Sequence, residues 1–344
     1  MLNDILENRF IENLASTFAR SPLQENGLQE SDAELIRLTG SDIMLAIKVD
    51  SIVEEIEMGL YRDPYLIGWM TVTAPASDLA AVGAKPLGIL IAETLAEDSE
   101  RHFISELQRG IKEAGEAYGI HVLGGDTNFS GSMQMTGCAL GIITDSKPMM
   151  RRGCKPGDHI YSSERLGLGS AYALSAYSEM GNDKPLDYRP LARLKEGELL
   201  RRFASACMDT SDGLLATLDQ LMRLNGTGFD VSTPLDQILH KAALDLACSS
   251  GIPPWLTLCG PHGEFELVFT IPPQRVDEFL QAARNIDWAP IYLGRVTETC
   301  NIMLNTGGGA KRVPTGAIRD LFSKVSGDLK RYISALLETD AAGR

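Results

Sequence analysis

Aspartates beside glycine, serine or threonine are the residues of this sequence best suited to chemistry. Most of them fall at turns or next to the ends of expected strands: Asp42, Asp50, Asp78, Asp126, Asp209 and Asp212. Mg²⁺ prefers carboxylate and water oxygens in an octahedral arrangement and commonly shares the phosphates of its substrate. Strand ends bring such ligands together from distant segments of a layered fold. The set therefore predicts a site for magnesium and a phosphorylated ligand.

Each aspartate also has a purely structural interpretation. A Ser-Asp pair at a turn commonly caps a helix, and Asp212 can do so because Gly213 and an apolar run follow it. Gly-Gly-Asp, which ends at Asp126, is typical of a turn. Asp78 differs because it lies inside an apolar stretch with helical spacing, where an acid needs a partner or a metal ion. Asp50 raises the same question within its strand.

Several other kinds of site are missing from the sequence. It contains no GxxxxGK[ST] phosphate loop, no HRD or DFG of protein kinases and no GxSxG nucleophile elbow. The Gly-Leu-Gly at residues 167–169 lacks the third glycine of a dinucleotide site. The five histidines are scattered and form no HExxH pair, so we expect them to be structural.

Composition sets wider limits. The 344 residues suggest about two domains, and 44% hydrophobic residues are enough for ordinary cores. The net charge of −14 argues against binding nucleic acid or an anionic membrane, although it allows a phosphorylated substrate. The six cysteines form no CxxC pair, which favours free thiols, a reducing cytoplasmic location and no zinc site. No apolar run approaches the length of a membrane span, and we expect residues 1–20 to form an amphipathic helix.

Alternating strands and helices must position the aspartates. In the first half the pattern predicts a helix that starts at Ser31–Glu34, then a strand at 43–53, a helix at 65–82, a strand at 86–94, a helix at 99–118, and strands at 121–123 and 133–143 joined by a GGDTNFSGS loop. The second half predicts strands at 158–162 and 264–271 and a pair of strands around 291–304. It also predicts helices at 169–180, 189–206, 214–224 and 275–283, and a turn at MDTSDG. This order indicates α/β or α+β layers in both halves. The segment 144–158, rich in proline, glycine and basic residues, is the expected domain boundary.

Five segments carry a family resemblance. DPYLIGWMTVTAPASDLAAVGAKPLGIL, GGDT, RRGCKPGD, MDTSDGLLATL and EFELVFTIPP occur in the order seen in thiamine-monophosphate kinase. The chain resembles this family over about residues 30–300. The family belongs to the superfamily of aminoimidazole ribonucleotide synthetase, selenophosphate synthetase and the hydrogenase maturation dehydratase. The resemblance implies a two-domain PurM-like fold, with a domain at 1–147 that binds ATP and pairs in a homodimer and a second domain at 148–344.

The resemblance also implies an activity. ATP and Mg²⁺ would be cofactors, and the γ-phosphate would pass directly to thiamine phosphate to give thiamine diphosphate, with no covalent enzyme intermediate. Positioning and metal ions would act in place of a catalytic side chain. The six aspartates named above fall on metal-ligand positions, and Gly125, Asp126, Arg151 and Ser211 fall on ATP-contacting positions. Glu57 and Glu264 fall beside the substrate.

The sequence also departs from the family pattern. Ser41 replaces one of two adjacent aspartates, and Lys48 and Val49 replace two hydroxyl residues before the strand aspartate. Lys48 thereby brings a cation to the same strand face as Asp50. Glu57 replaces a substrate-contacting histidine, and Pro261-His262-Gly263 replaces a glycine pair and an acid.

These departures leave three interpretations open. The chain is a divergent thiamine-monophosphate kinase, a related ATP-dependent enzyme with another small phosphorylated substrate, or a nucleotide-binding paralogue without turnover.

Overall fold

The computed structural model describes residues 4–144, 147–177, 186–260, 262–307, 309–325 and 328–342. Two compact units divide the chain. The first unit comprises Pro22–Met149 and Arg189–Arg202, and the second unit comprises Met1–Ser21, Met150–Tyr188 and Phe203–Arg344. One crossing between the units, at Met149–Met150, lies within the expected boundary segment 144–158. Residues from both ends of the sequence belong to the second unit.

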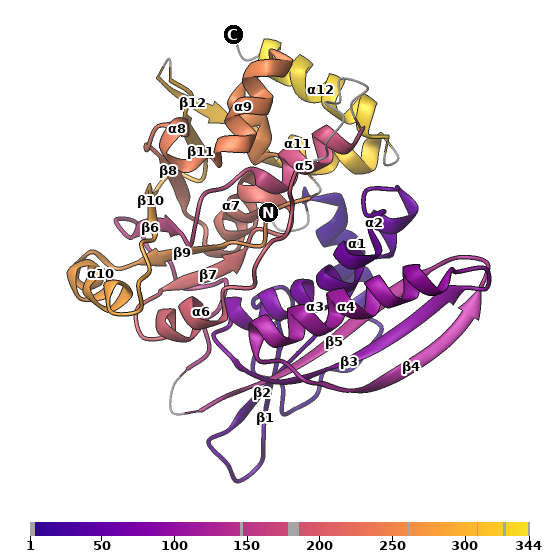
Figure 1. The fold of residues 1–344 in the computed structure, drawn as a ribbon. Helices are drawn as coiled ribbons and strands as arrows, with labels where there is room; N and C mark the ends of the chain where they lie inside the picture. The colour runs from indigo at the N-terminus through magenta and orange to yellow at the C-terminus, as the bar shows by residue number, and fades with distance from the viewer. Residues whose placement is uncertain are drawn as a thin grey trace. The chain divides into compact units, whose positions relative to one another are not determined.

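The first unit is built on a five-stranded sheet. Its strands run in the order β1 (Glu34–Arg37), β2 (Met44–Ser51), β5 (Gln134–Ile143), β3 (Lys85–Ala96) and β4 (Val122–Ser130). Neighbours are antiparallel except β3 and β4, which are parallel. The helices of this unit are α2 (Val53–Glu57), α3 (Pro64–Ala81), α4 (Arg101–Tyr118) and α6 (Leu194–Leu200). Figure 1 shows α3 and α4 side by side over one face of the sheet.

Helix α3 is the central element of the first unit. Asp63 caps it by accepting a hydrogen bond from Tyr65 N, and Pro64 occupies its first turn. The helix is buried on nearly every side because the sheet, α4 and α6 all pack against it. Gly68 lets α4 approach closely, since a Cβ there would lie 2.0 Å from the Leu107 carbonyl oxygen. The packing fixes the last turn of α3, which carries Asp78.

The second unit is built on a seven-stranded sheet. Its strands run in the order β12 (Ala310–Val313), β11 (Ile302–Asn305), β8 (Gly228–Val231), β10 (Ile291–Thr297), β6 (His159–Ser162), β9 (Leu267–Ile271) and β7 (Ala206–Asp209). The α-helices are α1 (Leu6–Ala15), α5 (Leu168–Tyr177), α7 (Gly213–Asn225), α8 (Leu235–Ile238), α9 (Lys241–Ser250), α10 (Val276–Arg284), α11 (Thr315–Lys324) and α12 (Leu329–Ala342), with 3₁₀ turns η2 (Pro254–Leu258) and η3 (Pro273–Arg275). Helix α1 belongs here because Asn8 donates a hydrogen bond to Gln220 and Glu7 forms an ion pair with Arg319.

Most predicted elements are confirmed, including the α/β layering and the helices that became α3, α4 and α7. Three predictions are wrong. Residues 34–37 form strand β1 and not a helix start, because Leu35 pairs with Ala46 of β2. GGDT is part of β4 and not a loop, because it pairs in parallel with β3.

The third wrong prediction is the helix at 189–206. Only Leu194–Leu200 is helical, and Ala206–Asp209 is strand β7, because pairing with β9 overrides the local preference. The last residues of the predicted helix at 169–180 lie outside the described residues. Within the described chain, every helix is too short or too polar to cross a membrane, and all six cysteines are free thiols.

Candidate active site

Asp78 makes an ion pair with a lysine from the neighbouring strand. Its side chain is buried on the last turn of α3, and Lys48 Nζ lies 3.2 Å from Asp78 Oδ1. The same nitrogen lies 3.3 Å from Asp50 Oδ1. Lys48 and Asp50 are two residues apart on β2, so both point to the same face, as predicted. The structure thus joins two predicted metal ligands through one ammonium group.

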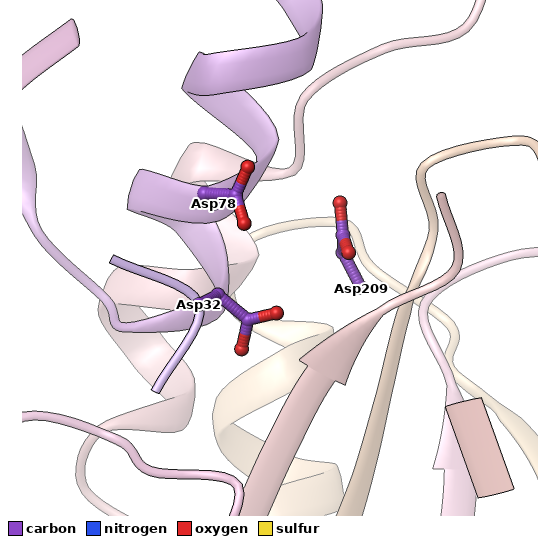
Figure 2. Close-up of side chains that lie close together, drawn as sticks. All are labelled: Asp32, Asp78 and Asp209. Atoms are coloured by element: carbon purple, nitrogen blue, oxygen red, sulfur yellow. The ribbon is translucent and has the colours of Figure 1, made fainter. Parts of the chain in front are cut away.

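Asp32 is a second buried acid beside Asp78. It lies on the segment before β1, and one of its carboxylate oxygens is within 4.8 Å of one of Asp78. Figure 2 shows the two carboxylates turned to the same side. Sequence reasoning missed Asp32 as a ligand because Ser31-Asp32 looked like the start of a helix. Its position before a strand that pairs with the Lys48 strand was the missing information.

The two carboxylate pairs of Asp78 differ in their fit to Mg²⁺. Around an octahedral Mg²⁺, neighbouring ligand oxygens lie about 3 Å apart and opposite ones about 4 Å apart. The spacing between Asp32 and Asp78 is compatible with a shared ion. Between Asp50 and Asp78 the ammonium of Lys48 takes the space that a shared ion would need. The residues present therefore fit a metal at the first pair and not at the second.

Two further predicted ligands of the first unit stand apart from these acids. Asp42 is exposed on the loop between β1 and β2, and Asp126 is exposed on β4, where Asn128 donates a hydrogen bond to it. In the part of the chain that the structure describes, neither joins a group of three metal-ligating side chains. Gly125 precedes Asp126 at a close approach of the strands, since a Cβ there would lie 1.8 Å from the Ile91 carbonyl oxygen.

The MDTSDG segment forms the end of β7 and the turn into α7. Asp209, also labelled in Figure 2, is buried at the carboxyl end of β7 and accepts a hydrogen bond from Ser211. Asp212 occupies the N-cap position of α7, but its side chain makes no capping hydrogen bond. Helix capping therefore does not account for Asp212, and it stays a predicted ligand. Arg151 lies in the second unit, where its carbonyl oxygen accepts a hydrogen bond from Asn225.

The loop before β9 packs on this turn through backbone contacts. Gly263 N donates to the Ser211 carbonyl oxygen at 2.7 Å, and Thr210 N donates to the Glu266 carbonyl oxygen at 2.8 Å. A Cβ at Gly263 would lie 1.6 Å from the Thr210 carbonyl oxygen. Only glycine permits this approach, so Gly263 is required for the close packing of the loop on the turn.

Glu264 is a buried carboxyl group held by backbone amides. Gly167 N donates to its Oε2 at 2.8 Å, and its Oε1 is buried with no hydrogen-bond partner. The pKa of Glu264 is raised to about 7, mainly by burial and to a smaller extent by the nearby charge of Glu266, while its hydrogen bonds oppose the increase. The next residue, Phe265, has a φ of 60°, a strained conformation for a non-glycine residue. Glu264 can therefore be either protonated or ionised near neutral pH.

His262 is part of the core of the second unit. It is 3% exposed and lies against the rings of Tyr172 and Tyr188, with ring centroids 6.1 and 5.0 Å away. Burial lowers its pKa to about 3, so the imidazole is neutral at physiological pH. The histidine that replaces a family glycine is structural, as expected for the histidines of this sequence. Pro261 lies outside the described residues.

The departures around the predicted substrate residue Glu57 are exposed. Glu57 ends the short helix α2, and Val49 on β2 is 58% exposed. Glu55, on the same helix, has one buried oxygen without a hydrogen-bond partner. Burial raises the pKa of Glu55, and the charges of Glu54 and Asp50 add to this effect. Helix α2 therefore adds acidic groups close to Asp50.

Comparison with known proteins identifies a family model that matches most of the first unit. Residues 30–143 match the family model of the AIR synthase related protein, N-terminal domain. The thiamine-monophosphate kinase of Buchnera aphidicola subsp. Acyrthosiphon pisum (strain APS) is 30% identical over 256 residues, which cover 72% of this chain and 77% of that protein. The chain belongs to the thiamine-monophosphate kinase family.

Solved structures agree with the family at the level of the fold. A protein of Thermus thermophilus is 27% identical, with a TM-score of 0.72 and coverage of 86% of this chain and 95% of that chain. The structure of AaThiL complexed with AMPPCP and TMP is 22% identical, with a TM-score of 0.71 and coverage of 89% and 95%. The predicted PurM-like fold is thereby confirmed.

Proposed function

We propose that this chain is a kinase that transfers the γ-phosphate of ATP to thiamine phosphate and produces thiamine diphosphate and ADP. The observation that carries the proposal is the 30% identity to a thiamine-monophosphate kinase across 72% of the chain. The matching fold of AaThiL, a structure that holds AMPPCP and TMP, supports it. Transfer is direct, so the protein supplies binding, orientation and charge neutralisation and forms no covalent intermediate.

Mg²⁺ is the proposed metal cofactor. When bound, it would neutralise charge on the nucleotide phosphates. Asp32 and Asp78 fit it in the first unit, and Asp42, Asp126, Asp209 and Asp212 stay predicted ligands. Gly125, Arg151 and Ser211 stay predicted ATP contacts, and the guanidinium of Arg151 suits phosphate oxygens because it can donate two parallel hydrogen bonds.

Glu264 and Glu57 are the proposed substrate residues. Glu264 fixes the loop before β9 through Gly167, so it would orient whatever binds beside the MDTSDG turn. Glu57 is exposed and adds negative charge where the family has a histidine. Like-charge repulsion would weaken capture of an anionic phosphate. We therefore expect slower turnover of thiamine phosphate than in a typical family member.

A different phosphorylated acceptor is the second candidate. Glu57 and Glu55 favour it, because helix α2 presents acids where the family contacts its substrate. Assays that supply ATP and Mg²⁺ with and without thiamine phosphate, followed by identification of the product, separate the two candidates. ATP consumption that requires another phosphorylated metabolite would favour the second one.

A homodimer through the first unit is also part of the proposal. Strand β4 forms one edge of its sheet and is exposed along almost its whole length. Val122, Leu123 and Phe129 are 52%, 56% and 63% exposed, which is unusual for large apolar residues on a strand. Exposed apolar edges of this kind pair with another chain.

Light scattering at micromolar concentration tests the dimer. We expect a mass of about twice the 37.4 kDa monomer. Phe129→Asp on β4 should shift the mass toward the monomer, whereas Phe10→Asp, an equally exposed apolar position on α1, should leave the dimer intact. A monomeric parent protein would contradict the proposed interface.

A further inference from the structure

Lys48 lies where two acids of the first unit converge. Its ammonium nitrogen is 3.3 Å from Asp50 Oδ1 and 3.2 Å from Asp78 Oδ1. Asp50 shares its strand, β2, and Asp78 comes from the last turn of α3. Both acids fall on positions where the family resemblance implies metal ligands. Lys48 itself stands where the family pattern has a hydroxyl residue, and a lysine cannot ligate a metal while it is protonated.

The surroundings favour a persistent ion pair. The side chain of Asp78 is 8% exposed, and those of Lys48 and Asp50 are 26% exposed. Such partly buried charges are screened much less than surface charges. The second oxygen of Asp50 is buried and makes no hydrogen bond, so Lys48 is the charge that compensates this carboxylate among the described residues.

The geometry leaves no room for a divalent ion in the same place. Mg²⁺ needs oxygen ligands at about 2.1 Å and an unobstructed octahedron. An ion shared by Asp50 and Asp78 would have to lie where the ammonium of Lys48 lies. The ammonium of Lys48 therefore supplies positive charge between Asp50 and Asp78 without a metal ion. It carries one charge, whereas a divalent ion would carry two.

We propose that Lys48 is a built-in cation that replaces one divalent metal ion between Asp50 and Asp78. The inference rests on the proposed function, and it specifies the metal requirement of the same site. It leaves Asp78 with Asp32 as the metal-binding pair of the first unit. The chain should accordingly bind one divalent ion fewer than its predicted ligands would allow, and its nucleotide affinity should depend less steeply on free Mg²⁺.

The test counts Mn²⁺ ions bound by the full-length protein without nucleotide, from the electron paramagnetic resonance signal of free Mn²⁺. The variants are Lys48→Ser, which restores a hydroxyl, and Lys48→Arg, which keeps the cation. We expect Lys48→Ser to bind about one more Mn²⁺ per chain than the parent, and Lys48→Arg to match the parent. In the double variant Lys48→Ser with Asp50→Asn the additional ion should be lost.

Equal Mn²⁺ stoichiometry in Lys48→Ser and the parent would overturn the proposal, because Lys48 would then be only a structural ion pair. A gain that persists in the double variant would overturn it too, because the new ion would not use Asp50. If Lys48→Ser does not fold, Lys48→Gln, which is closer in shape to lysine, takes its place. The Mn²⁺ stoichiometry of Lys48→Gln is then compared with the parent in the same way. Since no ATP or thiamine phosphate is present, these results are independent of the proposed kinase activity. A parent that fails to phosphorylate thiamine phosphate would instead count against the proposed function.

Discussion

The acidic side chains that we single out have different partners in the two units. In the first unit, Asp78 and Asp50 contact the ammonium of Lys48. In the second unit, backbone amides hold Glu264, which makes no ion pair within the described residues, and its pKa is raised to about 7. Among the described residues, Glu264 is buried without a side-chain cation beside it, and burial of this kind favours the protonated form. We therefore expect variants at Asp78 to change mainly metal binding and variants at Glu264 to change mainly the pH dependence of stability.

Removing the charge of Asp78 should have the largest effect. Asp78→Asn would weaken both the Lys48 ion pair and the proposed metal pair with Asp32. We expect Mg-ATP affinity to fall about 100-fold, or about 3 kcal/mol, together with a lower melting temperature because Lys48 loses a partly buried partner. Isothermal titration calorimetry and thermal denaturation measure the two effects.

Asp126→Asn and Asp98→Asn are the matched exposed variants in the same unit. Asp126→Asn should reduce Mg-ATP affinity about 10-fold without lowering stability, and Asp98→Asn should change neither. Unchanged Mg-ATP binding in Asp78→Asn would show that Asp78 is only a partner of Lys48 and not a metal ligand.

Changing Glu264 should alter the pH dependence of stability. Its pKa of about 7 in the folded protein exceeds the ordinary value of 4.5, so the folded state binds this proton more tightly between those pH values. The contribution of Glu264 to the free energy of unfolding is present below pH 4.5 and is lost as pH rises to 7. Glu264→Gln removes this loss. We expect the stability of the variant relative to the parent to increase by up to about 3 kcal/mol across the window.

His262, in the same loop, should have the opposite effect on how stability changes with pH. Its folded-state pKa of about 3 lies below the ordinary 6.5, so its contribution to stability rises with pH between these values. In the parent protein, the contributions of Glu264 and His262 to the pH dependence of stability have opposite signs and partly cancel. In His262→Asn, stability should therefore fall more steeply between pH 4.5 and 6.5. Denaturant unfolding at several pH values measures both slopes. A Glu264→Gln curve parallel to that of the parent would mean that Glu264 titrates normally.

The smallest expected effect is at Glu57, which is exposed on helix α2. Glu57→His should raise kcat/KM for thiamine phosphate about 3- to 5-fold, because it removes an acid and adds a hydrogen-bond donor beside the phosphate. Glu57→Gln separates the loss of charge from the gain of the imidazole, and Glu54→Gln is the control on the same helix. If kcat/KM is the same in all four proteins, Glu57 does not face the phosphate acceptor.

Sequence patterns predicted the parts of the site that depend on local periodicity. The helical spacing of apolar residues over 65–82 predicted α3 and an Asp78 inside an apolar stretch, and the two-residue spacing on β2 placed Lys48 on the same face as Asp50. Asp32 and the strand character of GGDT were not predictable in this way. Both depend on partners distant in sequence, since β1 pairs with β2 and β4 pairs with β3. At Gly125 a sequence typical of a turn instead allows close contact between strands.

Product identification tests the central claim most directly. The unmodified protein is incubated with ATP, Mg²⁺ and thiamine phosphate, and thiamine diphosphate and ADP are quantified chromatographically over time. Direct phosphoryl transfer predicts that the two products appear in equal amounts and that neither forms without thiamine phosphate. ADP formation without thiamine diphosphate, or nucleotide binding with no turnover, would contradict the assignment of this chain as a thiamine-phosphate kinase.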